Sequence, residues 1–148
     1  MNELALSRLK ESGWTADRHV DYSEIEKAYS DNGLEMPDEL REFFDRFAFL
    51  KIVYILPNGK IEKHFFNPVY AFWDNDYDYF STIFNDYNIF GTAYPMGSVD
   101  EEMTLYYHDN GNYYLYMDGG PLICIGDSLD IMMDNLIGCI VNNWRYID

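Results

Sequence analysis

Residues 103–125 read MTLYYHDNGNYYLYMDGGPLICI, and the architecture of the chain follows from this stretch. It holds three apolar runs, Met103–Tyr107, Tyr113–Met117 and Leu122–Ile125, separated by two segments rich in Asp, Asn and Gly. Such segments form tight turns, so the runs are predicted to be strands joined by hairpins. An antiparallel meander is favoured, because parallel strands would need crossovers of a dozen or more residues.

The region before this stretch contains another hairpin. Lys51–Leu56 and Lys60–Phe66 flank Pro57-Asn58-Gly59, which is a strong turn signal. Residues 67–90 follow as a mixed segment of acidic and aromatic residues. The central part of the chain is therefore predicted to be mostly strands.

The region after it is predicted to be one long helix. Apolar residues recur every three or four positions over residues 127–145, and Asp127 can cap the start. Gly138 lies inside this pattern, where it costs about 1 kcal/mol relative to Ala. We interpret it as a place where another element comes close.

The first 50 residues are predicted to form three helices. The first covers about residues 2–12 and ends at Gly13, the second runs from a cap at Asp21 to Gly33, and the third begins at Pro37. The whole chain, residues 1–148, is thus expected to be a single α+β domain, an antiparallel β-sheet meander with N-terminal helices and a long C-terminal helix packed on it. The third helix carries one apolar stripe, Leu40, Phe43, Phe44 and Phe47.

The composition restricts the class of partner. The chain has 26 Asp plus Glu against 10 Lys plus Arg, a formal charge of −16. This charge disfavours direct binding to nucleic acid and to anionic membranes, and it favours a basic protein partner. The N-terminus lacks a signal-peptide pattern and no window resembles a membrane span, so a cytoplasmic location is expected. Cys124 and Cys139 are interpreted as buried free thiols.

No constellation of catalytic residues is apparent, and no catalytic residue, metal or cofactor is predicted. The three histidines lie far apart, and nucleophile-elbow, phosphate-loop and dinucleotide-binding motifs are absent. Asp74–Asp78 resembles the start of a calcium loop, but Tyr79 and Asn85 stand where that loop needs Gly and Glu. Weak binding of a divalent ion by these carboxylates stays open.

Two acidic clusters are candidates for contacts with a partner protein. The chain has 14 tyrosines, more than a core can bury comfortably, because each buried hydroxyl needs a hydrogen-bond partner. Exposed aromatic residues anchor interfaces, and carboxylates around them complement Lys and Arg. The alternative is that the aromatics fill the core and the acids lie in solvated loops. The candidate contact residues are Asp74, Asp76, Tyr77, Asp78, Asp100, Glu101 and Glu102.

Several short motifs follow one another along nearly the whole chain. They are Leu9, Gly13-Trp14, Arg18, Val20-Asp21, Tyr29, Gly33, Leu40–Phe47, Phe66-Asn67-Pro68, Tyr94-Pro95-Met96-Gly97, Leu115-Tyr116-Met117-Asp118, Gly120 and Ile125-Gly126-Asp127-Ser128. Their order resembles the SUKH superfamily of bacterial immunity proteins, most closely its third subfamily. One departure is Ala48-Phe49, where many members have Gly-Gly, so the turn there must have another geometry.

The resemblance implies a non-enzymatic α+β protein that neutralises a cognate polymorphic toxin in bacterial competition by covering its active site. Many such toxins are nucleases with basic channels, which suits a charge of −16. The seven candidate residues above would then be toxin-binding residues. Two alternatives are a regulatory protein-binding scaffold and a carboxylate-dependent hydrolase. The identity of the toxin, the binding surface and the oligomeric state stay open.

Overall fold

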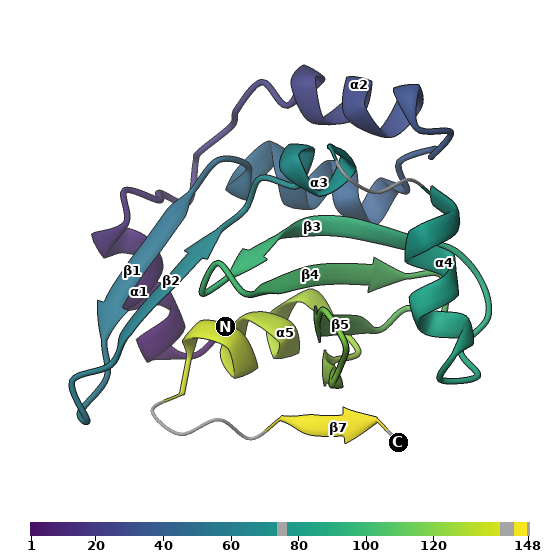
Figure 1. The fold of residues 1–148 in the computed structure, drawn as a ribbon. Helices are drawn as coiled ribbons and strands as arrows, with labels where there is room; N and C mark the ends of the chain where they lie inside the picture. The colour runs from purple at the N-terminus through teal and green to yellow at the C-terminus, as the bar shows by residue number, and fades with distance from the viewer. Residues whose placement is uncertain (74–76, 140–143, 148) are drawn as a thin grey trace.

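The structure is a computed structural model and describes residues 1–73, 77–139 and 144–147. Within these ranges, helices at both ends of the chain surround a run of strands (Figure 1). The elements in chain order are α1 (Glu3–Glu11), α2 (Ser23–Asp31), α3 (Asp38–Phe47), β1 (Lys51–Ile55), β2 (Ile61–Phe65), the 3-10 helix η1 (Val69–Phe72), α4 (Tyr77–Asn85), β3 (Ala93–Val99), β4 (Met103–His108), β5 (Tyr113–Met117), β6 (Leu122–Gly126), α5 (Leu129–Ile137) and β7 (Arg145–Ile147).

The described strands form one seven-stranded antiparallel sheet in chain order, from β1 at one edge to β7 at the other. Each strand pairs with the next through a short connection, except where helices intervene. The register shifts once between Pro95 and Gly97 in β3, and again at the start of β5. The predicted α+β class and the antiparallel meander are therefore confirmed.

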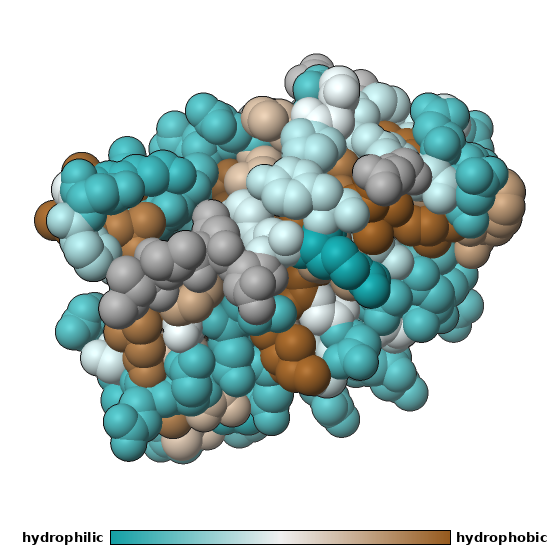
Figure 2. Space-filling model, turned by 90° about the horizontal axis from the view of Figure 1, so that it is seen from below, coloured by the Kyte–Doolittle hydropathy of each residue, from teal (hydrophilic) through white to brown (hydrophobic). Residues whose placement is uncertain are grey.

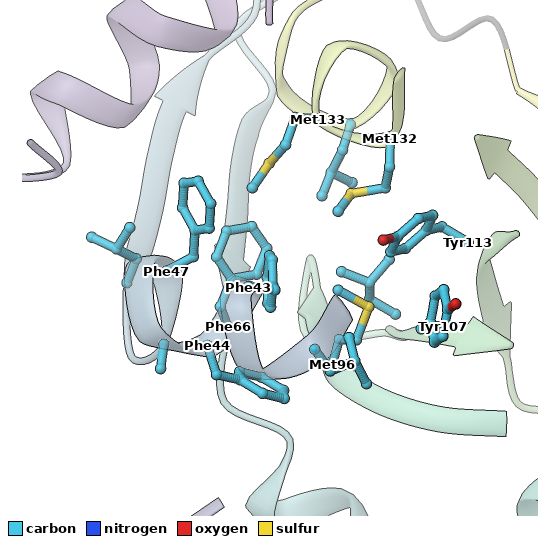
Figure 3. Packing of buried hydrophobic residues seen from close by; sticks show 14 of the residues in the cluster. Phe43, Phe44, Phe47, Phe66, Met96, Tyr107, Tyr113, Met132 and Met133 are labelled. Atoms are coloured by element: carbon cyan, nitrogen blue, oxygen red, sulfur yellow. The ribbon is translucent and has the colours of Figure 1, made fainter. Parts of the chain in front are cut away.

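The two faces of the sheet carry separate hydrophobic clusters. Side chains of a strand alternate between faces, so Leu105 and Leu115 join the larger cluster with α1, α2, α3 and α5. Tyr106 and Tyr114 point to the other face, where α4 covers them through Phe84. Figure 3 shows the larger cluster, with the phenylalanines of α3 at one end and the methionines of α5 above the sheet. The predicted stripe of α3 is fully buried there.

The turn after α3 takes the chain into the sheet. Phe49 has a φ of 66°, a left-handed conformation that glycine adopts more readily. Its amide donates to the carbonyl of Phe66 at 2.9 Å, and the amide of Phe66 donates to the carbonyl of Leu50 at 3.0 Å. These bonds extend the pairing of β1 and β2, so the strained turn starts the sheet directly at the end of the helix.

The last helix is shorter than predicted, because α5 ends at Ile137 and Gly138 lies just after it as its C-cap. The close approach at Gly138 is confirmed, since a Cβ there would lie 2.6 Å from Oδ1 of Asn2. Nδ2 of Asn2 donates to the carbonyl of Gly138 at 2.9 Å. Arg8 donates to the carbonyls of Ile137 and Cys139 at 2.9 and 3.1 Å. The α1 helix thus satisfies carbonyl groups that the end of α5 leaves without helical partners.

The residues after this helix add a strand to the sheet. Arg145–Ile147 form β7, in which Arg145 pairs with Cys124 and Ile147 with Leu122. The prediction of a helix to residue 145 was therefore wrong, and Ile140 and Val141 of its apolar stripe lie outside the described residues. The periodic pattern alone could not show that Gly138 ends the helix.

The two cysteines are free, as expected, but they are half-buried and not buried. Cys124 packs against the cluster under α4, and Sγ of Cys139 donates to the carbonyl of Asn135 at 3.1 Å. None of the described helices is both long enough and apolar enough to cross a lipid bilayer.

Candidate protein-binding site

The predicted contact residues occupy two separate places in the fold. Asp74 and Asp76 lie outside the described residues, Tyr77 begins α4, and Asp78 is exposed in the first turn of that helix. The acids of residues 100–102 form the turn between β3 and β4. In Figure 1 this turn and α4 lie at opposite ends of β4. The structure therefore does not bring Asp78 together with the acids of the turn.

The β3–β4 turn holds one structural acid and two exposed ones. Asp100 and Glu101 both have positive φ, 54° and 61°, as in the turns that match the twist of a hairpin. Asp100 accepts from the amide of Lys63 at 2.8 Å and forms an ion pair with Lys60 at 3.5 Å. Asp100 is thus held against β2, whereas Glu101 and Glu102 are exposed to solvent and available to a partner.

Asp100 also shares a hydrogen bond with the buried carboxyl of Glu62. Glu62 is 6% exposed, and burial, then the bond to Asp100, raises its pKa despite the nearby ammonium of Lys60. Burial alone would raise the pKa of Asp100, but hydrogen bonds from Glu62 and the amide of Lys63 outweigh it and lower that pKa. The hydrogen bond between the two carboxyl groups therefore raises the pKa of Glu62 and lowers that of Asp100. Because Glu62 is buried, the pair serves to join the turn to β2.

A groove that no local pattern in the sequence predicts gathers acids from distant segments of the chain. It lies between α3, the β4–β5 hairpin and the start of α5, and it has a volume of about 340 Å³. The exposed acids Glu39, Glu42 and Asp127 line it, and no lysine or arginine is among its described lining residues. The nearby Arg41 pairs instead with Glu26 and Asp38, at 3.0 and 3.9 Å. The negative charge of the groove is therefore not neutralised by those contacts of Arg41. The remaining lining residues are Tyr107, Gly111, Tyr113, Ser128 and Leu129.

Two tyrosines give the groove a polar wall. Tyr107 and Tyr113 are only 8% and 4% exposed, and their ring centroids lie 5.1 Å apart (Figure 3). No hydrogen bond joins either hydroxyl to another of the described residues. Burial, then the neighbouring Tyr107 and Glu39, raise the pKa of Tyr113 to about 12, and burial, Glu39 and Asp109 raise that of Tyr107. The negative charge of Glu39 therefore raises the pKa of both hydroxyls through space, without a hydrogen bond to either.

Sequence reasoning had only an indirect signal for this groove. The buried stripe of α3 implies that Glu39 and Glu42, three residues apart, lie off the core-facing side. Nothing local connects them with Asp127 or with the tyrosines of the hairpin. Their meeting depends on how α3 and α5 pack on the same face of the sheet.

A second surface of different character lies on the β1–β2 hairpin. Ile55 and Ile61 form a cross-strand pair, and with Val53 they are 68%, 52% and 56% exposed. Lys51 and Lys63, with Glu101 of the β3–β4 turn, border a hollow of about 230 Å³ beside this hairpin. The molecule therefore carries an apolar patch, bordered by charges of both signs, at one edge of its sheet. By contrast, Figure 2 shows a face on which hydrophilic residues dominate and apolar residues reach the surface in separate patches.

No group of three or more His, Cys, Asp and Glu side chains in the described ranges could hold a metal ion. Compared with protein-family models, with curated proteins and with solved structures, the chain shows no significant match.

Proposed function

We propose that this protein is a SUKH-like immunity protein that binds a basic toxin domain, of nuclease type, and covers its active site. The observation that carries the proposal is the groove of Glu39, Glu42 and Asp127, whose charge no lining lysine or arginine offsets. A net charge of −16 adds long-range attraction for a basic partner. The α+β architecture agrees with the fold that the resemblance to this superfamily implies.

The role is one of binding, without chemistry on a small molecule. Toxin neutralisation needs a surface that occupies the basic substrate channel, and exposed carboxylates can stand in for phosphates there. The groove and the exposed Glu101 and Glu102 are candidate parts of such a surface. A cytoplasmic location and activity within bacterial competition belong to the same proposal.

The direct test uses the toxin domain that the proposal predicts to be encoded by the gene beside this one. Purified toxin and this protein, mixed at low salt, are expected to form a stoichiometric complex that lacks the toxin's activity. Raising the salt concentration should slow association, because the attraction is electrostatic. Failure to form a complex at low salt, with both proteins folded, would overturn the proposal.

Two sets of substitutions locate the binding surface. The first neutralises the groove with Glu39→Gln, Glu42→Gln and Asp127→Asn, and the second neutralises the turn with Glu101→Gln and Glu102→Gln. Loss of charge at the interface should reduce the association rate about tenfold, while the other set should have a small effect. Equal, small effects of both sets would place the interface elsewhere.

A second candidate function is a regulatory scaffold that binds other cellular proteins, and the β1–β2 hairpin favours it. Its exposed Val53, Ile55 and Ile61 form the kind of apolar surface that marks a protein-binding site. Substituting Ile55→Thr and Ile61→Thr should leave toxin binding intact if the groove is the toxin site. Loss of toxin binding in this variant, with the groove variants unaffected, would place the toxin interface on the hairpin and contradict a separate scaffold surface there.

A further inference from the structure

We propose that the groove is a pocket for a single arginine side chain of the partner, with Glu39 and the hydroxyls of Tyr107 and Tyr113 as its recognition groups. This inference rests on the proposed function, because it names the chemical group on the partner that the acidic surface would receive. It goes beyond charge attraction, since it predicts a specific anchor at a defined place.

The two tyrosine hydroxyls are the first observation. Only 4% of Tyr113 and 8% of Tyr107 are exposed, yet both residues line the groove. Neither hydroxyl belongs to the fully buried polar atoms that lack a hydrogen-bond partner among the described residues, so both stay accessible from the groove. Two accessible hydroxyls beside a carboxylate make a set of acceptors to which a cationic donor can bond.

The spacing of the acids excludes a metal ion as that cation. A divalent ion needs its oxygen ligands to converge at about 2.0–2.6 Å. The described carboxylates do not gather in this way anywhere, including in the groove. A space of about 340 Å³ between them suits a larger organic cation.

The arrangement of acceptors favours guanidinium over ammonium. Three carboxylates and two hydroxyls lie on several sides of the groove. A guanidinium group offers five N–H donors in a plane and binds carboxylates in a bidentate way, whereas ammonium offers three donors from one point.

The experiment is a titration of the full protein with capped tripeptides, Gly-Arg-Gly, Gly-Lys-Gly and the neutral Gly-citrulline-Gly, followed by NMR at low salt. The arginine peptide is expected to bind in the millimolar range and to shift the amide signals of Gly111, Tyr113 and Ser128. The lysine peptide should bind several-fold more weakly, and the citrulline peptide about tenfold more weakly or not at all. Equal affinity for arginine and citrulline, or no binding of the arginine peptide into the millimolar range, would overturn the inference.

Matched variants identify the recognition groups. Glu39→Gln should weaken binding of the arginine peptide about tenfold and Tyr113→Phe about threefold. Glu11→Gln, an exposed helical acid away from the groove, and Tyr146→Phe, an exposed tyrosine of β7, should leave the affinity unchanged. Glu42→Gln replaces Glu39→Gln if the latter does not fold. Similar losses in the groove variants and the controls would reduce the effect to net charge and contradict a specific pocket.

The peptide titration needs no toxin, so the two proposals fail separately. A toxin complex that forms normally with Glu39→Gln and Tyr113→Phe would overturn the arginine pocket and leave the immunity role. Specific binding of the arginine peptide without any complex with the neighbouring toxin would overturn the immunity role and leave the arginine pocket.

Discussion

At the scale of single residues, Gly97 shows how closely β3 approaches the chain after β2. A Cβ at this position would meet the carbonyl of Phe65 and lie 3.0 Å from Cα of Phe66. Both are backbone atoms, which cannot move aside as a side chain can. Gly97 is therefore required by its neighbours, and not by its own φ.

Gly97→Ala is expected to destabilise the protein by about 3 kcal/mol, because the backbones of two strands must separate. Gly13→Ala is the control, since Gly13 has a φ of 95° but open space around its Cβ position. It should cost about 1–2 kcal/mol from conformational strain alone. Urea unfolding of both variants checks this, and equal losses would show that crowding at Gly97 is not the cause.

His64 shows how burial couples one residue to pH. It is 3% exposed, and burial lowers its pKa to about 4, with Arg8 and Lys60 adding to the effect and Asp100 opposing it. Its Nε2 lies 3.0 Å from the hydroxyl of Tyr54. The side chain is thus neutral in the folded protein at pH 7.

Because the folded pKa is depressed, the contribution of His64 to stability is present above pH 6.5. It is lost as the pH falls from about 6.5 towards 4, where only the unfolded chain binds the proton, and the loss amounts to roughly 3 kcal/mol. His64→Gln should remove this part of the pH dependence. Unfolding free energies measured between pH 7 and pH 5 for both proteins check it, and parallel curves would contradict it.

At the scale of elements, contacts join α1, the first helix of the described chain, to α5, the last one. The Asn2 side chain caps α1 by accepting from the backbone amide of Ala5 at 2.9 Å, and the backbone N–H of Asn2 donates to Oδ1 of Asp134 at 2.7 Å. Its Nδ2 donates to the carbonyl of Gly138. One residue thus begins the first helix and binds the end of the last.

Two helix caps can therefore be compared within one molecule. Ser128 caps α5 only through a bond from the amide of Ile131 at 3.2 Å, so Ser128→Ala should cost about 1 kcal/mol. Asn2→Ala loses its cap bond and the bond to Gly138, and should cost about 2 kcal/mol. Thermal or urea unfolding measures both. A smaller loss for Asn2→Ala than for Ser128→Ala would show that the contact with α5 contributes little.

At the scale of the whole molecule, the charge of −16 produces self-repulsion in the folded state. Several described ion pairs relieve it locally, such as Lys27 with Asp31 and Lys60 with Glu62. The 26 acids nevertheless outnumber the 10 Lys and Arg residues. Bringing a basic partner to this surface would relieve the same repulsion. The net charge is thus linked to stability and to binding together.

Salt is therefore expected to stabilise the isolated protein at pH 7. Raising the salt from about 10 mM to about 150 mM shortens the Debye length from about 30 Å to about 8 Å and should raise the unfolding free energy by about 1 kcal/mol. Near the sequence pI of about 4.2 the salt effect should vanish. Chemical unfolding at the two salt concentrations measures it, and a fall in stability with salt at pH 7 would contradict the prediction.

Local signals in the sequence were enough for most of the fold. Pro57-Asn58-Gly59 and the Asp-Asn-Gly segment after β4 determine hairpins, because turn preferences act over a few neighbouring residues. The apolar period of α3 likewise identifies its buried side. The apolar period predicted the helix wrongly beyond Gly138, because distant segments decide the structure there. The contact from Asn2 comes from 136 residues away, and β7 pairs with β6, about twenty residues before it.

The predicted contact acids were identified by clustering along the chain, and the fold separates Asp78 from Glu101 and Glu102. The groove of Glu39, Asp127 and Tyr113 exists only because α3, α5 and the β4–β5 hairpin meet on one face of the sheet. Composition and short-range patterns thus established an acidic α+β chain and the positions of its hairpin turns. The position of its uncompensated carboxylates followed from packing between distant segments, since electrostatic neighbours are set by distance in space and not by separation along the chain.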